Sequence, residues 1–466
     1  MKIIQYSNYK RKGIAIGWMI VTIMLLVGIM ALMIEGARIY YTSHQLQNTA
    51  DAAALAGSRY VAVYSDPAYS GNAETNARDV AAYYALQNRV LGNRQIQLNL
   101  NEGNDPAGEI VIGKYISQLA SDGDPETIPF TPTLDSPNAM KVLDNMGNSS
   151  ANAPLPMMLG KIFGGQSRHL SRYAIAKIHN PYGAGLLALG KCDCPGVTFS
   201  GAGSVDDLVV FGGGSVYSNS INNESIAVAG NVTTDIESIY AVGGIDPKFY
   251  NPNNDISVMD INADLGEDNF EPDPYESLPD AVYGTTPDFG TISESGTYSE
   301  GYYSGGIQVN DSGTTITLQP GDYYLDSVGQ AASLSTTGGL ITGEGVTLHI
   351  IGDADKGVDV GGNANIDISA PTSGPYADIA IFQKRNPDYD CDLSCSKFPL
   401  SELLGTGNIN IEGAIYMPHN KLTLGGTGDI ILNRTVADRF IIQGTSQKVI
   451  DYKGKPRIAD KSYLVE

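Results

Sequence analysis

The longest apolar stretch of the chain runs from Ile14 to Ile34, 21 residues without a charged side chain. A helix of this length crosses about 30 Å of hydrocarbon. Trp18 lies near one end of the stretch, where an amphipathic ring suits the membrane–water interface. Residues 14–34 are therefore predicted to form a single transmembrane helix.

The charges on either side of this helix predict its orientation. Glu35 and Arg38 follow the apolar stretch, whereas the basic residues before it are Lys2, Lys10, Arg11 and Lys12. The excess of Lys and Arg on one side places residues 1–13 in the cytoplasm and the rest of the chain across the membrane, as in a signal-anchor protein.

Processing of the N-terminus is the competing interpretation. The apolar stretch is longer than that of a secretory signal, and no clear A-x-A site follows it. The segment from Lys10 to Gly13 resembles the basic leader of a prepilin, but Trp18 stands where a prepilin has Glu. We expect no processing.

Residues 35–65 continue the helical pattern beyond the membrane. Leu46, Ala50, Ala53, Gly57 and Val61 recur at spacings of three and four, so they share one helical face. Most of these residues are small, which allows another element to approach closely. The face is predicted either to pack on the chain's own head domain or to dock other helices of an envelope assembly.

The segment from Leu46 to Ala56, LQNTADAAALA, carries a specific resemblance. Together with the preceding apolar stretch and Glu35, it resembles the N-terminal module of the TadE/TadG-like Flp pilus-assembly family. That family usually has Asp at the place of Glu35 and LQNAADAAALA at the motif. Its helix interaction motif would correspond here to Leu46, Gln47, Asn48, Ala50, Asp51, Ala53 and Leu55.

This resemblance implies a membrane-anchored envelope protein of a tight-adherence pilus system in a bacterial inner membrane. The expected partners are the membrane and other pilus-assembly or pilin components, with surface glycans as a further candidate. Stretches at 138–143, 154–165, 317–326, 370–383 and 409–426 also resemble parts of TadG-like proteins. The ectodomain is expected in the periplasm or outside the cell.

Residues 66–185 mix helical and strand patterns, which indicates a small α+β head. Residues 76–91 predict a helix, and 154–164 a short helix. The predicted strands cover residues 95–101, 109–115 and 168–179.

From residue 186 to 466 short β-rich runs alternate with Gly, Asn, Ser and Asp. A motif of apolar, small and Gly residues followed by a new apolar run recurs at 199–205, 360–366 and 424–430, and more weakly at 228–234. Such units bury their apolar faces only by stacking. We predict a right-handed parallel β-helix, a solenoid, with a β-sandwich as the alternative.

Composition narrows the possible functions. The chain has 466 residues, 54 of them Gly, and a formal net charge of -22. Nucleic-acid binding depends mainly on Lys and Arg that neutralise phosphates, so such a partner is not expected. Residues 247–290 are rich in Asp, Glu and Pro and are predicted to be an excursion from the stacked coils.

Four cysteines form two close pairs, Cys192 with Cys194 and Cys391 with Cys395. Disulfides suit an oxidising compartment, and a four-thiolate zinc site is the alternative. Because residues 192 and 391 should lie several coils apart, we predict that Cys391 bonds to Cys395. Cys192 and Cys194 are predicted not to pair with them.

Candidate chemistry is sparse. The histidines show no metal-binding spacing. A calcium-loop spacing is formed by Asp260, Asn262, Asp264, Asp268 and Glu271, with Gly266 among them, but Leu265 stands where a turn glycine belongs. Calcium is therefore a weak hypothesis, and no other cofactor is expected.

A β-helix can also carry paired carboxylates that cleave polysaccharides. Asp359, Asp367 and Asp429 lie on or beside candidate strands, and nothing marks two of them as a pair. We expect a non-enzymatic envelope component of a Flp/Tad-type pilus or adhesion system. The alternatives are a membrane-anchored polysaccharide-degrading enzyme and a surface adhesin unrelated to pili.

Overall fold

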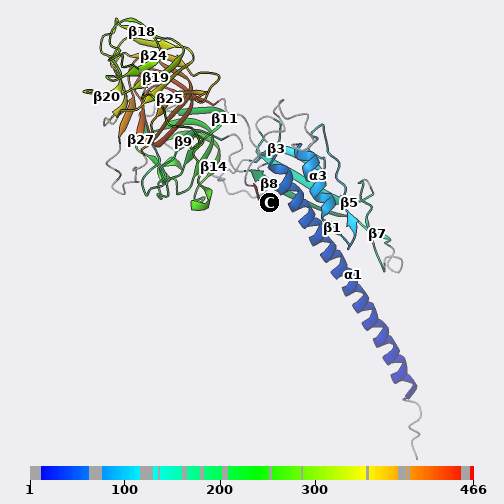
Figure 1. Ribbon diagram of the computed structural model, residues 1–466. Helices are drawn as coiled ribbons and strands as arrows, with labels where there is room; N and C mark the ends of the chain where they lie inside the picture. Colours follow the sequence, from blue (N-terminus) through cyan, green and yellow to red (C-terminus); the bar gives the residue numbers. More distant parts are fainter. Residues whose placement is uncertain are drawn as a thin grey trace, which may run out of the picture. The chain divides into compact units, whose positions relative to one another are not determined.

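The structure, a computed structural model, divides into two compact units (Figure 1). It describes residues 12–61, 76–115, 130–134, 137–148, 150–159, 165–178, 183–201, 208–250, 254–284, 287–352, 356–386, 395, 399–452 and 462–465. The first unit comprises residues 1–115, 130–181 and 457–466, and the second 116–129 and 182–456. Most of the predicted cytoplasmic segment 1–13 lies outside the described residues. Whereas the sequence placed all residues from 186 in the body, 457–466 return to the first unit.

One unbroken helix, α1 (Lys12–Ser58), dominates the first unit. It joins the predicted transmembrane and juxtamembrane helices without a break. The part of the chain that the structure describes has one helix long and apolar enough to cross a membrane, and this is α1. Large side chains from Ile16 to Ile34 are exposed, whereas Leu46, Ala50 and Ala53 are fully buried.

The buried half of α1 packs on a head with a five-stranded antiparallel sheet. The strand order is β30-β8-β5-β3-β4, with β30 at Ser462–Leu464, β8 at Leu170–Ile178, β5 at Ala139–Met146, β3 at Ile110–Tyr115 and β4 at Phe130–Pro132. Helix α3 (Ala77–Gln87) lies beside α1 (Figure 1). The strand next to β8 thus comes from the far end of the chain.

Two short hairpins complete the head. They pair β1 (Arg89–Val90) with β2 (Arg94–Gln95) and β6 (Leu155–Pro156) with β7 (Ser167–Arg168). The predicted strand at 95–101 is wrong beyond Gln95. The predicted helix at 154–164 is also wrong in its described part, because Leu155 and Pro156 form a strand; residues 160–164 lie outside the described residues.

The second unit is a parallel β-helix, as predicted, in which strands of successive coils pair in parallel. Its hand stays a prediction. Four complete coils are formed by three strands each: β15 (Gly296–Tyr298), β16 (Gly301–Tyr303) and β17 (Ile307–Val309); β18 (Thr315–Leu318), β19 (Gly321–Leu325) and β20 (Ala332–Thr336); β21 (Leu340–Gly343), β22 (Val346–Ile350) and β23 (Lys356–Val360); β24 (Asn365–Ser369), β25 (Ile379–Gln383) and β26 (Leu400–Leu403). The next two coils are the long bent strands β27 (Ile409–Leu424) and β28 (Ile430–Gly444).

The core of the β-helix is built from aliphatic side chains stacked in register. Residue pairs in adjacent coils link Ile316, Ile341, Ile366, Ile409 and Ile430, all 2 % exposed or less. The recurring glycine motif at 424–430 falls at the corner between β27 and β28, as the repeat pattern predicted. Each coil therefore buries its apolar face only against its neighbours.

The chain enters the β-helix in the middle of the stack. β28 pairs with three separate strands: β29 (Lys448–Asp451), β9 (Ala184–Ala188) and β10 (Val197–Gly201). One coil is thus composed of the last strand of the body and its first two strands. Beyond it lie β11 (Leu208–Ser218) with β12 (Ile226–Val228), then β13 (Thr233–Ala241) and β14 (Asp255–Asn262).

The predicted excursion at 247–290 is shorter than expected, because β14 within it is a coil strand paired with β13. After β14 the chain passes from this end of the stack to the other, where Asp288 and Ile292 bridge to Tyr302 and Ile307. We call residues 263–284 and 287–290 the strap.

Candidate functional site

The small-residue face of α1 packs on the chain's own head, the first of the two predicted interpretations. Leu46 belongs to a buried cluster with Val90, Ile96, Met146 and Leu155. A Cβ at Gly57 would lie 2.5 Å from the Met140 sulfur, so only glycine fits this approach. The apolar positions of the motif therefore hold the helix to the sheet.

The polar residues of the motif take part in the same junction. The Gln47 side chain donates to Asp51 Oδ1 at 2.7 Å and to the Tyr173 carbonyl of β8 at 3.0 Å. Ser462 of β30 donates to the Leu55 carbonyl. Asn48 is exposed. Among the named motif residues, Asn48 is thus the one with an exposed side chain.

Glu35 marks the point where α1 passes from its exposed apolar half to its packed half. Its side chain is buried, and both carboxylate oxygens accept from the backbone N–H of Met158, at 3.1 and 3.3 Å. Arg38, 3.9 Å from Glu35, donates to the Pro156 carbonyl at 2.8 Å. Two charged residues after the apolar stretch therefore hold the hairpin β6–β7 against the helix.

A buried carboxyl group lies beneath the motif. Asp144 of β5 is fully buried, and neither of its oxygens has a hydrogen-bond partner among the described residues. Burial, followed by the nearby carboxylates of Glu109 and Asp51, raises the pKa of Asp144 to about 8. Asp144 is therefore protonated at neutral pH. No sequence signal marked this residue, because it stands in an ordinary alternating strand.

On the second unit the strap covers an outward-facing ladder of mostly aromatic side chains. In-register pairs connect Tyr302, Tyr324, His349, Phe382, Tyr416, Val436, Leu187, Tyr217 and Tyr240. Apolar side chains of the strap pack on this ladder: Leu265, Phe270, Tyr275 and Leu278. The strap thus crosses the coils and gives the β-helix a second apolar layer outside its core.

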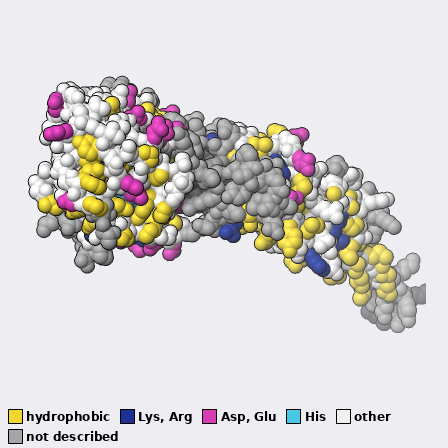
Figure 2. Space-filling view, turned by 45° about the horizontal axis from the view of Figure 1, so that its top comes forward, with side chains coloured by type: hydrophobic (Ala, Val, Ile, Leu, Met, Phe, Trp, Pro, Cys, Tyr) yellow, Lys and Arg dark blue, Asp and Glu magenta, His cyan; other side chains and the backbone are white. Residues whose placement is uncertain are grey.

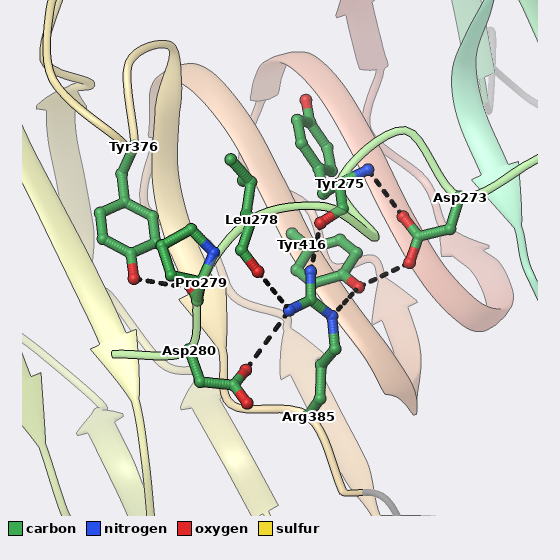
Figure 3. A network of polar contacts seen from close by, with 8 residues as sticks. All are labelled: Asp273, Tyr275, Leu278, Pro279, Asp280, Tyr376, Arg385 and Tyr416. Atoms are coloured by element: carbon green, nitrogen blue, oxygen red, sulfur yellow. Dashed lines mark hydrogen bonds and ion pairs between the residues drawn. The ribbon is translucent and has the colours of Figure 1, made fainter. Parts of the chain in front are cut away.

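Arg385, just after β25, fastens the centre of the strap (Figure 3). Its guanidinium donates to the carbonyls of Tyr275 and Leu278 and lies 3.3 Å from Asp280 Oδ1. It also donates to the Tyr416 hydroxyl, which donates to Asp273 at 2.7 Å. The fork of guanidinium donors suits such a set of converging acceptors.

The tyrosines of this network are held neutral. Burial raises the pKa of Tyr376 to about 12, and its hydroxyl donates to the Pro279 carbonyl at 2.9 Å. Burial, followed by the Asp273 carboxylate, also raises the pKa of Tyr416. These hydroxyls act as hydrogen-bond donors that hold the strap.

The cysteine prediction is wrong. Cys395 forms a disulfide with Cys194, whose Cα lies 5.9 Å away, and not with Cys391. Cys192 is disulfide-bonded as well, and Cys391 lies outside the described residues. The error came from assuming that coils stack in chain order. Because the chain enters mid-stack, β10 and β26 lie on the same side of the β-helix with only the coils of β27 and β28 between them.

The predicted calcium ligands are spread along the chain between β14 and the strap. Asp260 and Asn262 belong to β14, whereas Asp264, Asp268 and Glu271 follow on the strap. Among the described side chains no group of three or more His, Cys, Asp or Glu could hold a metal ion; the Asp260 side chain lies outside them. Calcium binding stays a prediction, which titration calorimetry on the full chain and its Asp264→Ala variant would test.

Two of the three candidate catalytic carboxylates, those of Asp359 and Asp367, make structural contacts. Asp359 and Glu402 are neighbours in adjacent coils, with Lys356 Nζ 3.2 Å from Asp359 and closer still to Glu402. Asp367, on a different side of the coil, accepts from the Asn410 side chain at 2.9 Å. Asp429 contributes its backbone carbonyl to Ile409. The lysine between Asp359 and Glu402 makes them a salt-bridged group.

Comparison with known proteins gives a family match for the N-terminal segment. No curated protein and no solved structure matches the chain significantly. Residues 13–65 match the family described as "Putative Flp pilus-assembly TadE/G-like". The matched segment is the apolar half of α1 with Glu35 and the packed motif. Residues 13–65 are therefore similar to the TadE/G-like family of Flp pilus assembly, and the β-helical body lies outside the matched segment.

Proposed function

We propose that this protein is a non-enzymatic, single-pass component of a Flp/Tad-type pilus-assembly or adhesion system in a bacterial inner membrane. Its N-terminus lies in the cytoplasm, α1 crosses the membrane, and the head and β-helix lie in the periplasm or outside the cell. Its partners are other pilus-assembly components or pilins.

The observation that carries this proposal is the coincidence of the family match with α1. The matched residues 13–65 contain both the exposed apolar stretch and the face that packs on the head. An apolar helix half with no covering protein fits hydrocarbon. Disulfide-bonded Cys192, Cys194 and Cys395 agree with a body outside the reducing cytoplasm.

The β-helix suits a mechanical task. Its coils are fastened by the in-register core, and the strap crosses them on the outside. A solenoid of this kind is a stiff element that offers a long lateral surface. We assign to it the role of a spacer or binding surface.

Topology can be tested with a cysteine introduced at the exposed Ser299 of the body. In spheroplasts this cysteine should react with a membrane-impermeant thiol reagent, because the body lies on the side of the membrane that faces away from the cytoplasm. Labelling only after cell lysis would place the body in the cytoplasm and refute the orientation. The unaltered chain is the control for reaction of its own cysteines.

The pilus role can be tested by deleting the chain and counting Flp pili by electron microscopy. Pili should be lost and should return with the unaltered chain. A Val27→Arg chain should fail to restore them, because Arg at the centre of a span opposes insertion by about 2.5–3.5 kcal/mol. Val27→Leu is the matched control. Unchanged pili and adhesion in the deletion strain would contradict the proposed function.

A further inference from the structure

The hairpin β6–β7 lies at a defined level along α1. Met158 follows β6, and its backbone N–H is bound by the Glu35 carboxylate. Glu35 comes directly after Ile34, the last residue of the apolar stretch. The hairpin therefore lies at the level along α1 where the apolar stretch ends.

Apolar and aromatic side chains are left uncovered at this level. Met158 is 70 % exposed, although a methionine of a folded head would normally be at least partly covered. Tyr40 and Tyr41 of α1 are 68 % and 64 % exposed. Figure 2 shows hydrophobic side chains continuing over the projecting helix. Tyr40 and Tyr41 thus follow the exposed apolar stretch by six and seven residues.

The distances fit the headgroup layer of a bilayer. Tyr40 lies six residues beyond Ile34, about 9 Å along a helix axis. Helical side chains tilt toward the N-terminus, so the rings of Tyr40 and Tyr41 reach back toward the apolar stretch. Tyrosine is enriched at this depth because its ring is apolar and its hydroxyl stays hydrated.

Charge near the hairpin agrees with such a surface. Arg168 of β7 is exposed and pairs with Leu155 across the hairpin. Arg38 lies in the same region, bound to the Pro156 carbonyl. Basic side chains close to a membrane surface are attracted by anionic headgroups, although the chain as a whole carries a net charge of -22.

We propose that Met158, Tyr40 and Tyr41 form a membrane-seating surface that rests on the lipid bilayer around α1. Glu35 acts as a positioning residue: it holds the Met158 backbone and thereby aims the hairpin at the lipid. The head is then seated directly on the membrane and not suspended above it by a free length of helix. This inference rests on the membrane anchorage proposed above.

The chain has a single tryptophan, Trp18, which makes fluorescence quenching a direct test. The full chain is placed in phosphatidylethanolamine–phosphatidylglycerol vesicles, with or without lipids brominated close to the headgroup. Two variants carry Trp18→Phe together with Met158→Trp or Tyr40→Trp. A third carries Trp18→Phe with Tyr83→Trp, because Tyr83 is 58 % exposed on α3 of the same unit.

The M158W and Y40W variants should emit at shorter wavelength than the Y83W variant and lose most of their emission to the brominated lipids. The Y83W emission should not change. Adding Glu35→Ala should restore the emission of the M158W variant. The same substitution should leave the Y40W variant quenched, because only the position of the hairpin depends on Glu35.

The unaltered chain separates this inference from the anchorage. If Trp18 is quenched by lipids brominated close to the headgroup, where its place near one end of the apolar stretch puts it, while the M158W and Y40W variants stay water-exposed, the anchor holds and the seating surface is refuted. If Trp18 is not quenched either, the membrane span fails and the seating fails with it. Shielding of the M158W variant only when other envelope proteins are added would also overturn the inference, in favour of a protein partner.

Discussion

Replacing Asp144 with asparagine should remove a steep pH dependence from the stability of the head. The carboxyl group is fully buried without a hydrogen-bond partner among the described residues, and its pKa in the folded protein is about 8 against a reference value of 3.8. Asparagine has nearly the same shape but does not titrate. The substitution therefore isolates the effect of the proton.

The sign follows from the proton count. Between pH 4 and pH 8 the folded head keeps the Asp144 proton, whereas the unfolded chain has lost it. The free energy of unfolding thus falls as the pH rises through this window, by about 1.4 kcal/mol for each pH unit. From pH 5 to pH 7 the loss amounts to about 3 kcal/mol, a large part of the stability of a small domain.

The full chain in detergent is titrated with urea at pH 5, 6, 7 and 8. The backbone amides are then pulse-labelled with deuterium at one common pH. Uptake in peptides from β5 and β8 reports the head. The D144N variant should show a smaller pH dependence than the unaltered protein by about 1.4 kcal/mol per unit. Glu102→Gln, at an exposed carboxylate of the same unit, should retain the original slope. Equal slopes for D144N and the unaltered chain would refute the reasoning.

Three further outcomes are expected. Gly426→Ala should destabilise the β-helix by about 1–3 kcal/mol or more, because φ is +101° at Gly426 and the added Cβ would lie 2.1 Å from the Gly405 carbonyl oxygen of the adjacent coil. Gly361→Ala is the control and should destabilise it little, because a Cβ there meets no atom within 4 Å. Equal thermal unfolding midpoints of the two variants would contradict this expectation. Non-reducing peptide mapping should recover the Cys194–Cys395 link, and finding these cysteines in separate local bridges would disprove the coil order. Arg385→Ala should increase the rate at which a glutamate-specific protease cleaves the strap. Arg385→Lys should give an intermediate rate, because lysine keeps the charge but not the fork of donors. An unchanged cleavage rate in Arg385→Ala would show that Arg385 does not hold the strap in place.

Local signals in the sequence predicted much of the architecture. The uncharged stretch 14–34 became the exposed half of α1, and the helical pattern after residue 76 became α3. The repeat at 424–430 marked a real corner, because a stacked turn with positive φ needs glycine. Each of these features depends on residues within a few positions of one another, which is what a periodicity can report.

The order of the coils could not be predicted in the same way. Every coil of a solenoid has a similar apolar pattern, so the sequence does not say which coils are neighbours. The disulfide prediction failed for this reason. β14 was missed because the acidic and proline-rich surroundings hid its short alternating run, DISVMDIN.

The burial of Asp144 and the fastening role of Arg385 depend on contacts between distant parts of the chain. Asp144 is surrounded by α1 and by residues before β3, and Arg385 meets a segment about a hundred residues earlier. A lone carboxylate in a strand or a lone arginine in a loop is ordinary in a sequence. Their significance appears only when the fold removes water from around them.

The mid-stack entry of the chain has a consequence for biogenesis. The central coil joins Leu186 to Thr435, and the head sheet joins Ile178 to Ser462, so both units close with strands that are made last. Contacts between residues so far apart form slowly, because a long loop has to be ordered first. A chain crossing the membrane with its N-terminus held behind would therefore expose unpaired edges at β8 and β9 until export is nearly finished. During that interval a periplasmic chaperone that covers these edges would raise the fraction of the protein that reaches the native state.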